Sequence, residues 1–329
     1  MSSIDRIGKK FAADNYRFAD IFNNYIYQGK PIISASDLKP AEIEELVLPS
    51  RKGRKEQIQR YRDIMKIWAA KQDGNAVYIL LGMELQNNIH YAMPAKTMLY
   101  DAANYIKQVE EKASANRQKD AESLKNSDEF LSGFRKEDKL IPVITLVLYL
   151  HEDPWDGPLS LHEMFGEYDR CILDLVPDYR MNLISPNMLS DEDIDKFSPD
   201  VDAVMRFIKY SKDKEKLLEK FEHNPRYESI AYQSVDLINA VTGAGLKYKK
   251  KGDKVDMCTA IEELRTEERQ FGIMQGIEQG FEQGIDQGIG IGQLRTLKNL
   301  TEKKIITVEQ AAEEAGMSVE EFLEKMMVS

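Results

Sequence analysis

The chain has 329 residues, of which 42% are hydrophobic, enough for a large folded domain with appendages. Its net charge of −11 by itself disfavours nucleic acid as a partner, and its two cysteines, Cys171 and Cys258, stand in no metal-binding spacing. No apolar run reaches the length of a membrane span and the first residues lack an apolar signal core, so we expect a soluble cytoplasmic protein without a membrane partner.

The first predicted element is an amphipathic helix over residues 11–27, where aromatic and aliphatic side chains recur at helical spacing. Short strands are expected over residues 45–48 and 61–68. Seven basic residues lie in the segment from Arg51 to Lys66, which runs from the first of these strands into the second. Such a segment suits a site that handles phosphate, and it is equally compatible with a solvated surface loop.

The central feature of the sequence is a predicted hairpin. A continuous apolar run over residues 76–83 predicts a strand covered on both faces. Residues 73–75, Asp-Gly-Asn, form a hairpin-type turn, so the strand over 61–68 should pair antiparallel with this run. Glu84 and Gln86 follow the run and share one face, because side chains alternate along a strand.

Two acids are expected to face each other across this hairpin. Asp63 lies 11 residues before Gly74 and Glu84 lies 10 residues after it. Carboxylates directly opposite each other repel, and a divalent cation such as Mg²⁺ would resolve the conflict because it prefers oxygen ligands. The alternative is that one acid forms an ion pair with Arg62 or Lys96.

Beyond the hairpin, a helix is predicted over residues 95–109 and a buried strand over 140–150. Residues 159–254 have a mostly helical pattern, with a long charged helix over 201–221 and a more apolar one over 227–241. The expected apolar stripe of the helix over 95–109 consists of Met98, Ala102, Tyr105 and Val109.

Several of these segments together carry a family resemblance. The runs DNYRFADIFN, YRDIMKIW, LLGMELQNNIHYAMPAKTMLYDAANYIKQ and IPVITLVLYL, followed by Pro-Trp-Asp-Gly at 154–157, resemble the bacterial PD-(D/E)XK nuclease-family transposases, a group that includes the recombination-promoting nucleases. The resemblance covers about residues 10–165 and extends loosely to about residue 290. It implies an α/β fold with a restriction-endonuclease-like core, a mixed sheet flanked by helices, over residues 1–165. The mostly helical pattern that follows predicts a helical cap over residues 166–260.

The resemblance also implies a function and a site. Asp63 would be the motif aspartate and Glu84 the acid of the E-x-K motif, and both would hold Mg²⁺, with Mn²⁺ able to substitute. Gln86 stands where most nucleases of the superfamily have lysine; it can orient water but cannot offset charge. The implied activity is that of a metal-dependent DNA endonuclease, linked to mobile elements and recombination or to phage defence.

Five further residues are candidates for contacts with DNA. Asn15 and Arg17 lie on the first helix, where the superfamily often adds a polar group, and Arg62 belongs to the basic segment. Lys96 follows the motif and can contact phosphate as a point charge. Gln108 lies on the next helix, where it either supports the site or is simply solvated.

The C-terminal part of the sequence is repetitive. Over residues 261–293, glycine recurs at every fourth position from Gly272 to Gly292, with isoleucine or phenylalanine and glutamine in phase. Each glycine costs an isolated helix about 1 kcal/mol, so a helix here needs a close partner, which predicts a homo-oligomer. The alternative for this segment is a flexible linker.

Residues 294–329 are predicted to form a small helical hairpin, with capping boxes that begin at Thr307 and Ser318 on either side of Gly316. It resembles a helix-turn-helix, but its acidic surface argues against DNA reading. No dinucleotide or Walker A fingerprint occurs, so no organic cofactor is expected. The alternatives to a nuclease are a catalytically weakened interaction protein of the same fold that self-associates through the glycine repeat, and a structural oligomer built on it.

Overall fold

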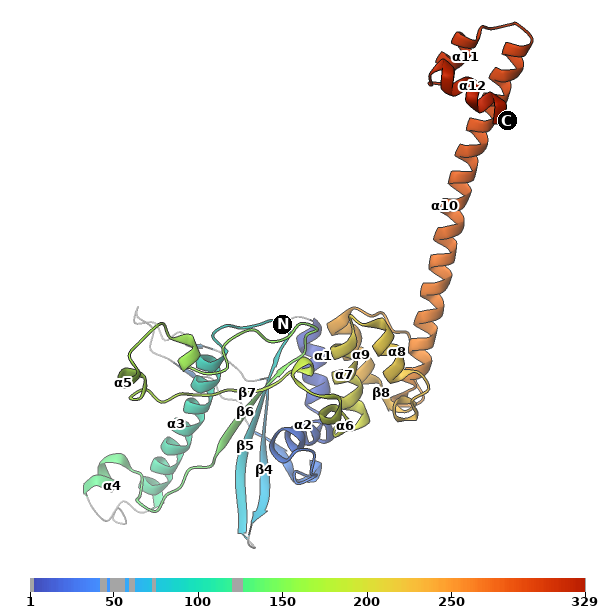
Figure 1. Ribbon diagram of the computed structural model, residues 1–329. Helices are drawn as coiled ribbons and strands as arrows, with labels where there is room; N and C mark the ends of the chain where they lie inside the picture. The colour runs from blue at the N-terminus through green and yellow to red at the C-terminus, as the bar shows by residue number, and fades with distance from the viewer. Residues whose placement is uncertain are drawn as a thin grey trace. The chain divides into compact units, whose positions relative to one another are not determined.

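The computed structural model describes residues 3–41, 46–47, 57–58, 63–72, 75–119 and 127–328 (Figure 1). The chain forms two compact units, Met1–Glu262 and Glu263–Ser329, and each is described by itself. Within the described residues, no helix is both long enough and apolar enough to cross a bilayer.

The first unit is built on a five-stranded mixed sheet in the order β1-β4-β5-β6-β7. The first three of these strands are antiparallel neighbours, whereas β5, β6 and β7 run parallel. This confirms an α/β fold with a mixed sheet and a mostly helical C-terminal half. The strands are β1 (Leu38–Pro40), β4 (Ile64–Gln72), β5 (Asn75–Gln86), β6 (Val143–Tyr149) and β7 (Asn182–Ile184).

The strand over 76–83 and its antiparallel partner are confirmed as β5 and β4. Leu81 and Met83 are fully buried, as expected for a covered strand, but Tyr78 near the start of β5 is 48% exposed. The covering of both faces therefore holds for residues 81–84 but not at Tyr78. A two-stranded ribbon of β2 (Leu46–Val47) and β3 (Gln57–Ile58) precedes β4 in the chain, and β2 matches the strand predicted over 45–48.

One face of the sheet is covered by α1 (Ser3–Ala12) and α2 (Asn15–Tyr27), whose phenylalanines belong to the core (Figure 1). The prediction of one helix over 11–27 was therefore wrong at its start. Asp14 interrupts it, because its extended backbone and its carboxylate, which accepts bonds from the Tyr16 and Arg17 amides, cap a new helix. The short 3₁₀ turn η1 (Ala35–Asp37) then leads into β1.

The other face is covered by α3 (Met93–Lys119), which makes the crossover between the parallel strands β5 and β6 (Figure 1). The predicted apolar stripe of this helix was wrong, because Met98 is 38% exposed while Thr97 and Asp101 are buried. Polar groups on the facing strands explain the difference: Thr145 of β6 donates a hydrogen bond to Asp101 at 2.5 Å. After α3, the small helix α4 (Ser127–Ser132) follows.

The region after β6 is mostly helical, as predicted, but it also supplies β7, the edge strand of the sheet. The long charged helix expected over 201–221 is in fact two helices, and the first of them is buried on all sides. Its buried Asp202 accepts hydrogen bonds from Arg206 and Tyr227, so the charges are satisfied inside the protein. The elements are η3 (His162–Met164), α5 (Arg170–Leu173), η4 (Pro186–Met188), α6 (Asp191–Asp195), α7 (Pro199–Tyr210), α8 (Lys214–Phe221), η5 (Pro225–Tyr227), β8 (Ile230–Ala231), α9 (Tyr232–Thr242) and β9 (Lys254–Val255).

The helix α10 (Met257–Glu302) begins in the first unit and runs through the glycine repeat, so residues 261–293 are helical. It is followed by α11 (Val308–Glu314) and α12 (Val319–Val328). The predicted hairpin is confirmed: Thr307 forms a full capping box, and Gly316 between the two helices has a φ of +68°. Ala311, Ala312 and Phe322 form its core.

Candidate functional site

The β4–β5 hairpin brings Asp63 and Glu84 together. Ile64 pairs with Met83 at the end of the ladder, so the next position outward sets Asp63 against Glu84. Asp63 Oδ2 accepts a hydrogen bond of 2.7 Å from the backbone amide of Leu85, which fixes the carboxylate at the end of β5. The alternation and the turn count of the sequence thus predicted this juxtaposition correctly.

Glu84 is 3% exposed, although it carries a carboxylate. Its Oε1 accepts a hydrogen bond of 2.5 Å from Lys96 Nζ and one of 3.3 Å from Gln86 Nε2. Its Oε2 is buried and has no hydrogen-bond partner among the residues that the structure describes. Burial raises the pKa of the Glu84 carboxyl and the charge of Asp63 raises it further, whereas Lys96 and the backbone amide of Asp63 lower it.

Each of the two acids has a lysine of its own. Lys9 of α1 reaches Asp63 with 2.6 Å between Nζ and Oδ1, and Lys96 of α3 pairs with Glu84. The ion pair between Glu84 and Lys96, one of the two possibilities that the sequence left open, is therefore present. Lys9 was not among the predicted site residues, because no local pattern indicates that α1 reaches the end of the hairpin.

The residues at this point also suit a divalent cation. Among the described residues, no group of three or more histidine, cysteine or acidic side chains is arranged as a metal site. Mg²⁺, however, commonly uses one or two carboxylates and completes its shell with water and substrate phosphate. The unpartnered Glu84 Oε2 beside Asp63 is the feature that fits, since a buried carboxylate oxygen without a donor is costly.

The interface between the sheet and α3 contains both an apolar cluster and a group of hydrogen-bonded polar side chains. Met93 and Val147 are fully buried and pack together with Trp155. Farther along α3, Asp101 accepts a hydrogen bond of 2.6 Å from Tyr179 in addition to that from Thr145. Glu84 is therefore linked to α3 through Lys96, whereas Asp63 is linked to α1 through Lys9.

The structure places the other predicted contact residues elsewhere or outside the described part. Asn15 donates to the backbone carbonyls of Ala35 and Leu38, at 3.0 and 3.2 Å, and accepts from Lys66. Its amide thus holds α2 to the sheet. Arg62 lies outside the described residues.

Arg17 and Gln108 also have structural partners. Arg17 is 7% exposed, donates to the Phe11 carbonyl at 2.9 Å and faces Asp200 at 3.5 Å. Gln108 exchanges two hydrogen bonds with the backbone of Ile141, at 3.0 and 2.6 Å. Neither is brought to the acid pair; of the four candidates that the structure describes, only Lys96 is.

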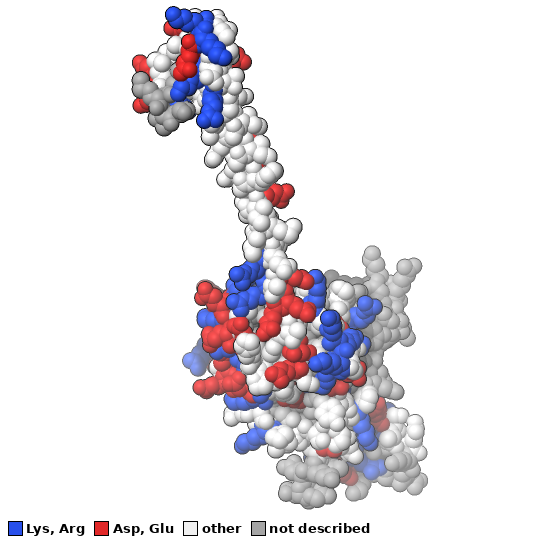
Figure 2. Space-filling model, turned by 90° about the vertical axis from the view of Figure 1, so that its right-hand side faces the viewer, with Lys and Arg blue, Asp and Glu red and all other residues white. Residues whose placement is uncertain are grey.

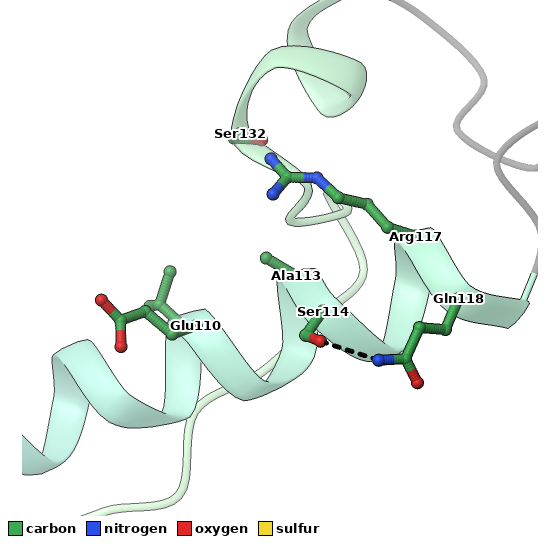
Figure 3. Close-up of a pocket in the computed structure, with 7 residues that line it drawn as sticks. Glu110, Ala113, Ser114, Arg117, Gln118 and Ser132 are labelled. Atoms are coloured by element: carbon green, nitrogen blue, oxygen red, sulfur yellow. Dashed lines mark hydrogen bonds between the residues drawn. The ribbon is translucent and has the colours of Figure 1, made fainter.

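A separate hollow lies along the second half of α3, next to the end of α4 (Figure 3). Figure 3 shows the Arg117 side chain extending toward Ser132, while Ser114 and Gln118 hydrogen-bond to each other at 3.2 Å. The lining does not include Asp63 or Glu84, so this hollow is not part of the candidate site.

Comparisons with known proteins add nothing to this geometry, because no family model, curated protein or solved structure matches the chain.

Proposed function

We propose that the protein is a metal-dependent phosphodiesterase that cleaves DNA, with Asp63 and Glu84 as its metal ligands. The observation that carries the proposal is the buried Glu84, which keeps one oxygen without a partner although it lies beside a second acid. A purely structural carboxylate at this depth would be expected to have both oxygens satisfied.

The order of the elements supports the same proposal. Two helices precede three antiparallel strands, β1, β4 and β5, and α3 then leads to the parallel strand β6. This is the helix, mixed sheet, helix and strand order that the resemblance to PD-(D/E)XK nucleases implies. The acid pair lies at the end of the central hairpin, where that resemblance expects it.

When bound, Mg²⁺ or Mn²⁺ would polarise a phosphoryl oxygen and increase the acidity of the attacking water. Asp63 and the free Oε2 of Glu84 are the groups available to hold the ion. A bound cation also favours the ionised form of Glu84, which burial otherwise disfavours.

Lys96 can supply the positive charge that the motif lysine provides in most nucleases of the superfamily. Gln86 lacks the charge that lysine supplies, but the ammonium of Lys96 lies 2.5 Å from the Glu84 carboxylate, so a cation is present at the acid pair. In the proposed site Lys96 offsets negative charge on the phosphate, and Gln86, which donates to Glu84, orients that carboxylate. Lys9 forms an ion pair with Asp63, as Lys96 does with Glu84.

The direct experiment is cleavage of supercoiled plasmid DNA by the full-length protein with Mg²⁺ or Mn²⁺ and with a chelator as control. Asp63→Asn should abolish nicking because it removes a ligand charge with little change in volume. If Asp63→Asn and Glu84→Gln both cleave as well as the wild type, the proposed site is wrong.

The second candidate is an interaction protein that self-associates through α10. The specific observation is a set of exposed apolar side chains on this helix, and each glycine of the ladder has open space where a side chain would start. On the face drawn in Figure 2, the middle of α10 shows few charged groups, although Glu278, Glu282 and Asp286 belong to this part of the helix. The exposed residues are Phe271, Ile273, Met274, Ile277, Phe281, Ile285, Ile289 and Ile291.

A further inference from the structure

A second group of basic residues lies far along the sequence from the basic segment at residues 51–66. The loop between α9 and β9 contains Lys247, Lys249, Lys250 and Lys251, and of these all are exposed. In a chain with a net charge of −11, a run of this kind is a local exception.

The fold brings α1 next to it. Gly8 lies where α1 passes between the sheet and α9, because a side chain there would meet Leu85 of β5 at 3.6 Å and Leu237 of α9 at 3.8 Å. From this position α1 presents basic side chains in two directions. Lys9 reaches Asp63 of the candidate site, while Lys10 points to the start of α9.

Two cations from different parts of the chain meet at the ring of Tyr232, the first residue of α9. Lys250 Nζ lies 3.4 Å and Lys10 Nζ 5.8 Å from the ring centroid. The ring attracts both cations, but it does not remove the repulsion between them. A polyanion at this position would offset that repulsion.

Lys249, Lys250 and Lys251 of the loop are available to such a partner. Among the described residues, none forms an ion pair with Lys249, Lys250 or Lys251. The acidic side chains nearby are engaged elsewhere or are few. They are Asp5 on α1, Asp253 in the loop, Asp236, which accepts from Tyr248, and Asp200, which faces Arg17 and Lys254.

We propose that these residues form a basic strip that binds the phosphate backbone of duplex DNA and leads it to the acid pair. The strip continues from Asp63 through Lys9 to the ring of Tyr232 and on to the exposed loop. Its members are Lys9, Lys10, Lys249, Lys250 and Lys251. This inference rests on the proposed function for its choice of DNA, but the strip binds DNA whether or not cleavage follows.

Duplex DNA fits the strip better than an anionic membrane does. In residues 3–12 and 244–254, all of which the structure describes, no large hydrophobic side chain is exposed, so the strip has nothing to insert into lipid. Long-range repulsion from the acidic remainder of the chain is screened beyond about 8 Å at physiological ionic strength. On the face drawn in Figure 2, basic groups gather in patches between acidic ones, which is compatible with local contacts of this kind.

The test is the affinity of the full-length protein for a short fluorescein-labelled DNA duplex, measured by anisotropy at several salt concentrations with a chelator present. The variant Lys249→Gln, Lys250→Gln, Lys251→Gln removes three charges from the strip. The matched control Lys112→Gln, Lys136→Gln, Lys139→Gln removes three exposed charges near α3 and α4. Both variants have the same net charge.

The strip variant should bind DNA at least about tenfold more weakly, and its salt slope should fall by about two to three, since each phosphate contact contributes roughly 0.9. The control should change neither quantity by a comparable amount. The double variant Lys249→Gln, Lys251→Gln keeps the contact between Lys250 and Tyr232, so it does not disturb the packing there. It should still show most of the loss of DNA affinity, which would exclude misfolding as the cause.

Equal losses in the strip variant and the control would overturn the inference, as would binding to phosphatidylserine vesicles in preference to DNA. Failure of the strip is distinguishable from failure of the proposed function. If DNA binding depends on the strip but no metal-dependent cleavage is found, the DNA-binding inference stands and the proposed nuclease function is wrong. If the protein cleaves DNA but the strip variant binds DNA as well as the wild type, the nuclease function stands and the DNA-binding inference is wrong.

Discussion

Replacement of Glu84 by glutamine should stabilise the folded protein at neutral pH. Burial and the neighbouring Asp63 raise the pKa of the Glu84 carboxyl, and together they outweigh the effect of Lys96, which lowers it. The charged form of Glu84 is therefore less favourable in the folded chain than in the unfolded one. Glutamine has nearly the same volume and carries no charge, and Lys96 has a side chain that is 20% exposed, so it can turn to water when its partner is lost.

The expected gain is on the order of 1 kcal/mol, because each unit by which a pKa is raised corresponds to about 1.4 kcal/mol and the lost ion pair offsets part of the gain. The sign of the pH dependence follows from the raised pKa. Wild-type stability falls as pH rises from the unfolded value of 4.5 through the higher folded value, whereas the variant lacks this loss. The advantage of the variant should therefore grow across that window and vanish below it.

Denaturant unfolding of both proteins between acidic and neutral pH measures this difference. Glu129→Gln is a suitable control, since Glu129 is also buried but accepts a hydrogen bond from the Lys136 amide, and its replacement should not stabilise the chain. If Glu84→Gln is less stable than the wild type at neutral pH, the carboxylate is a net structural contributor. The ion-pair interpretation of the site would then replace the metal site.

Three further predictions concern Gln86, Lys96 and the C-terminal part. Gln86→Lys should retain plasmid cleavage whereas Gln86→Leu should lose most of it; an unchanged rate in Gln86→Leu would show that this side chain only packs. Lys96→Met should lower the single-turnover cleavage rate roughly 100-fold or more, as expected for a group that offsets transition-state charge, and Lys96→Arg should retain more of it; equal rates in the two variants would assign Lys96 a structural role. Truncation after Thr266 leaves the first unit intact and should turn an oligomer into a monomer by light scattering, whereas a full-length monomer at micromolar concentration would remove the oligomer.

The juxtaposition of Asp63 and Glu84 could be predicted from sequence because it depends on short-range rules. Strand alternation sets the face of Glu84, and the count of residues from the turn sets its partner. The break between α1 and α2 has a local signal as well. Asp14 is a good N-cap residue, and its position in the middle of the predicted helix could have indicated the start of a new one.

Other features depend on contacts between distant parts of the chain. Lys9 reaches Asp63 because α1 packs between β5 and α9, with Gly8 next to Leu85 and Leu237, and no local pattern shows this. The buried face of α3 was mispredicted because a count of apolar residues cannot anticipate that Thr145 will hydrogen-bond to Asp101. The strand β7 is short, so a strand pattern of three residues carries little signal.

The central claim is that Asp63 and Glu84 form a metal-dependent site for phosphodiester cleavage. The most direct test compares plasmid nicking by the wild type, Asp63→Asn and an exposed control, Asp156→Asn, across a titration of Mg²⁺ and Mn²⁺ with a chelator blank. We expect metal-dependent nicking by the wild type and the control and none by Asp63→Asn. Nicking that persists in the chelator, or that is equal in all three proteins, would contradict the account.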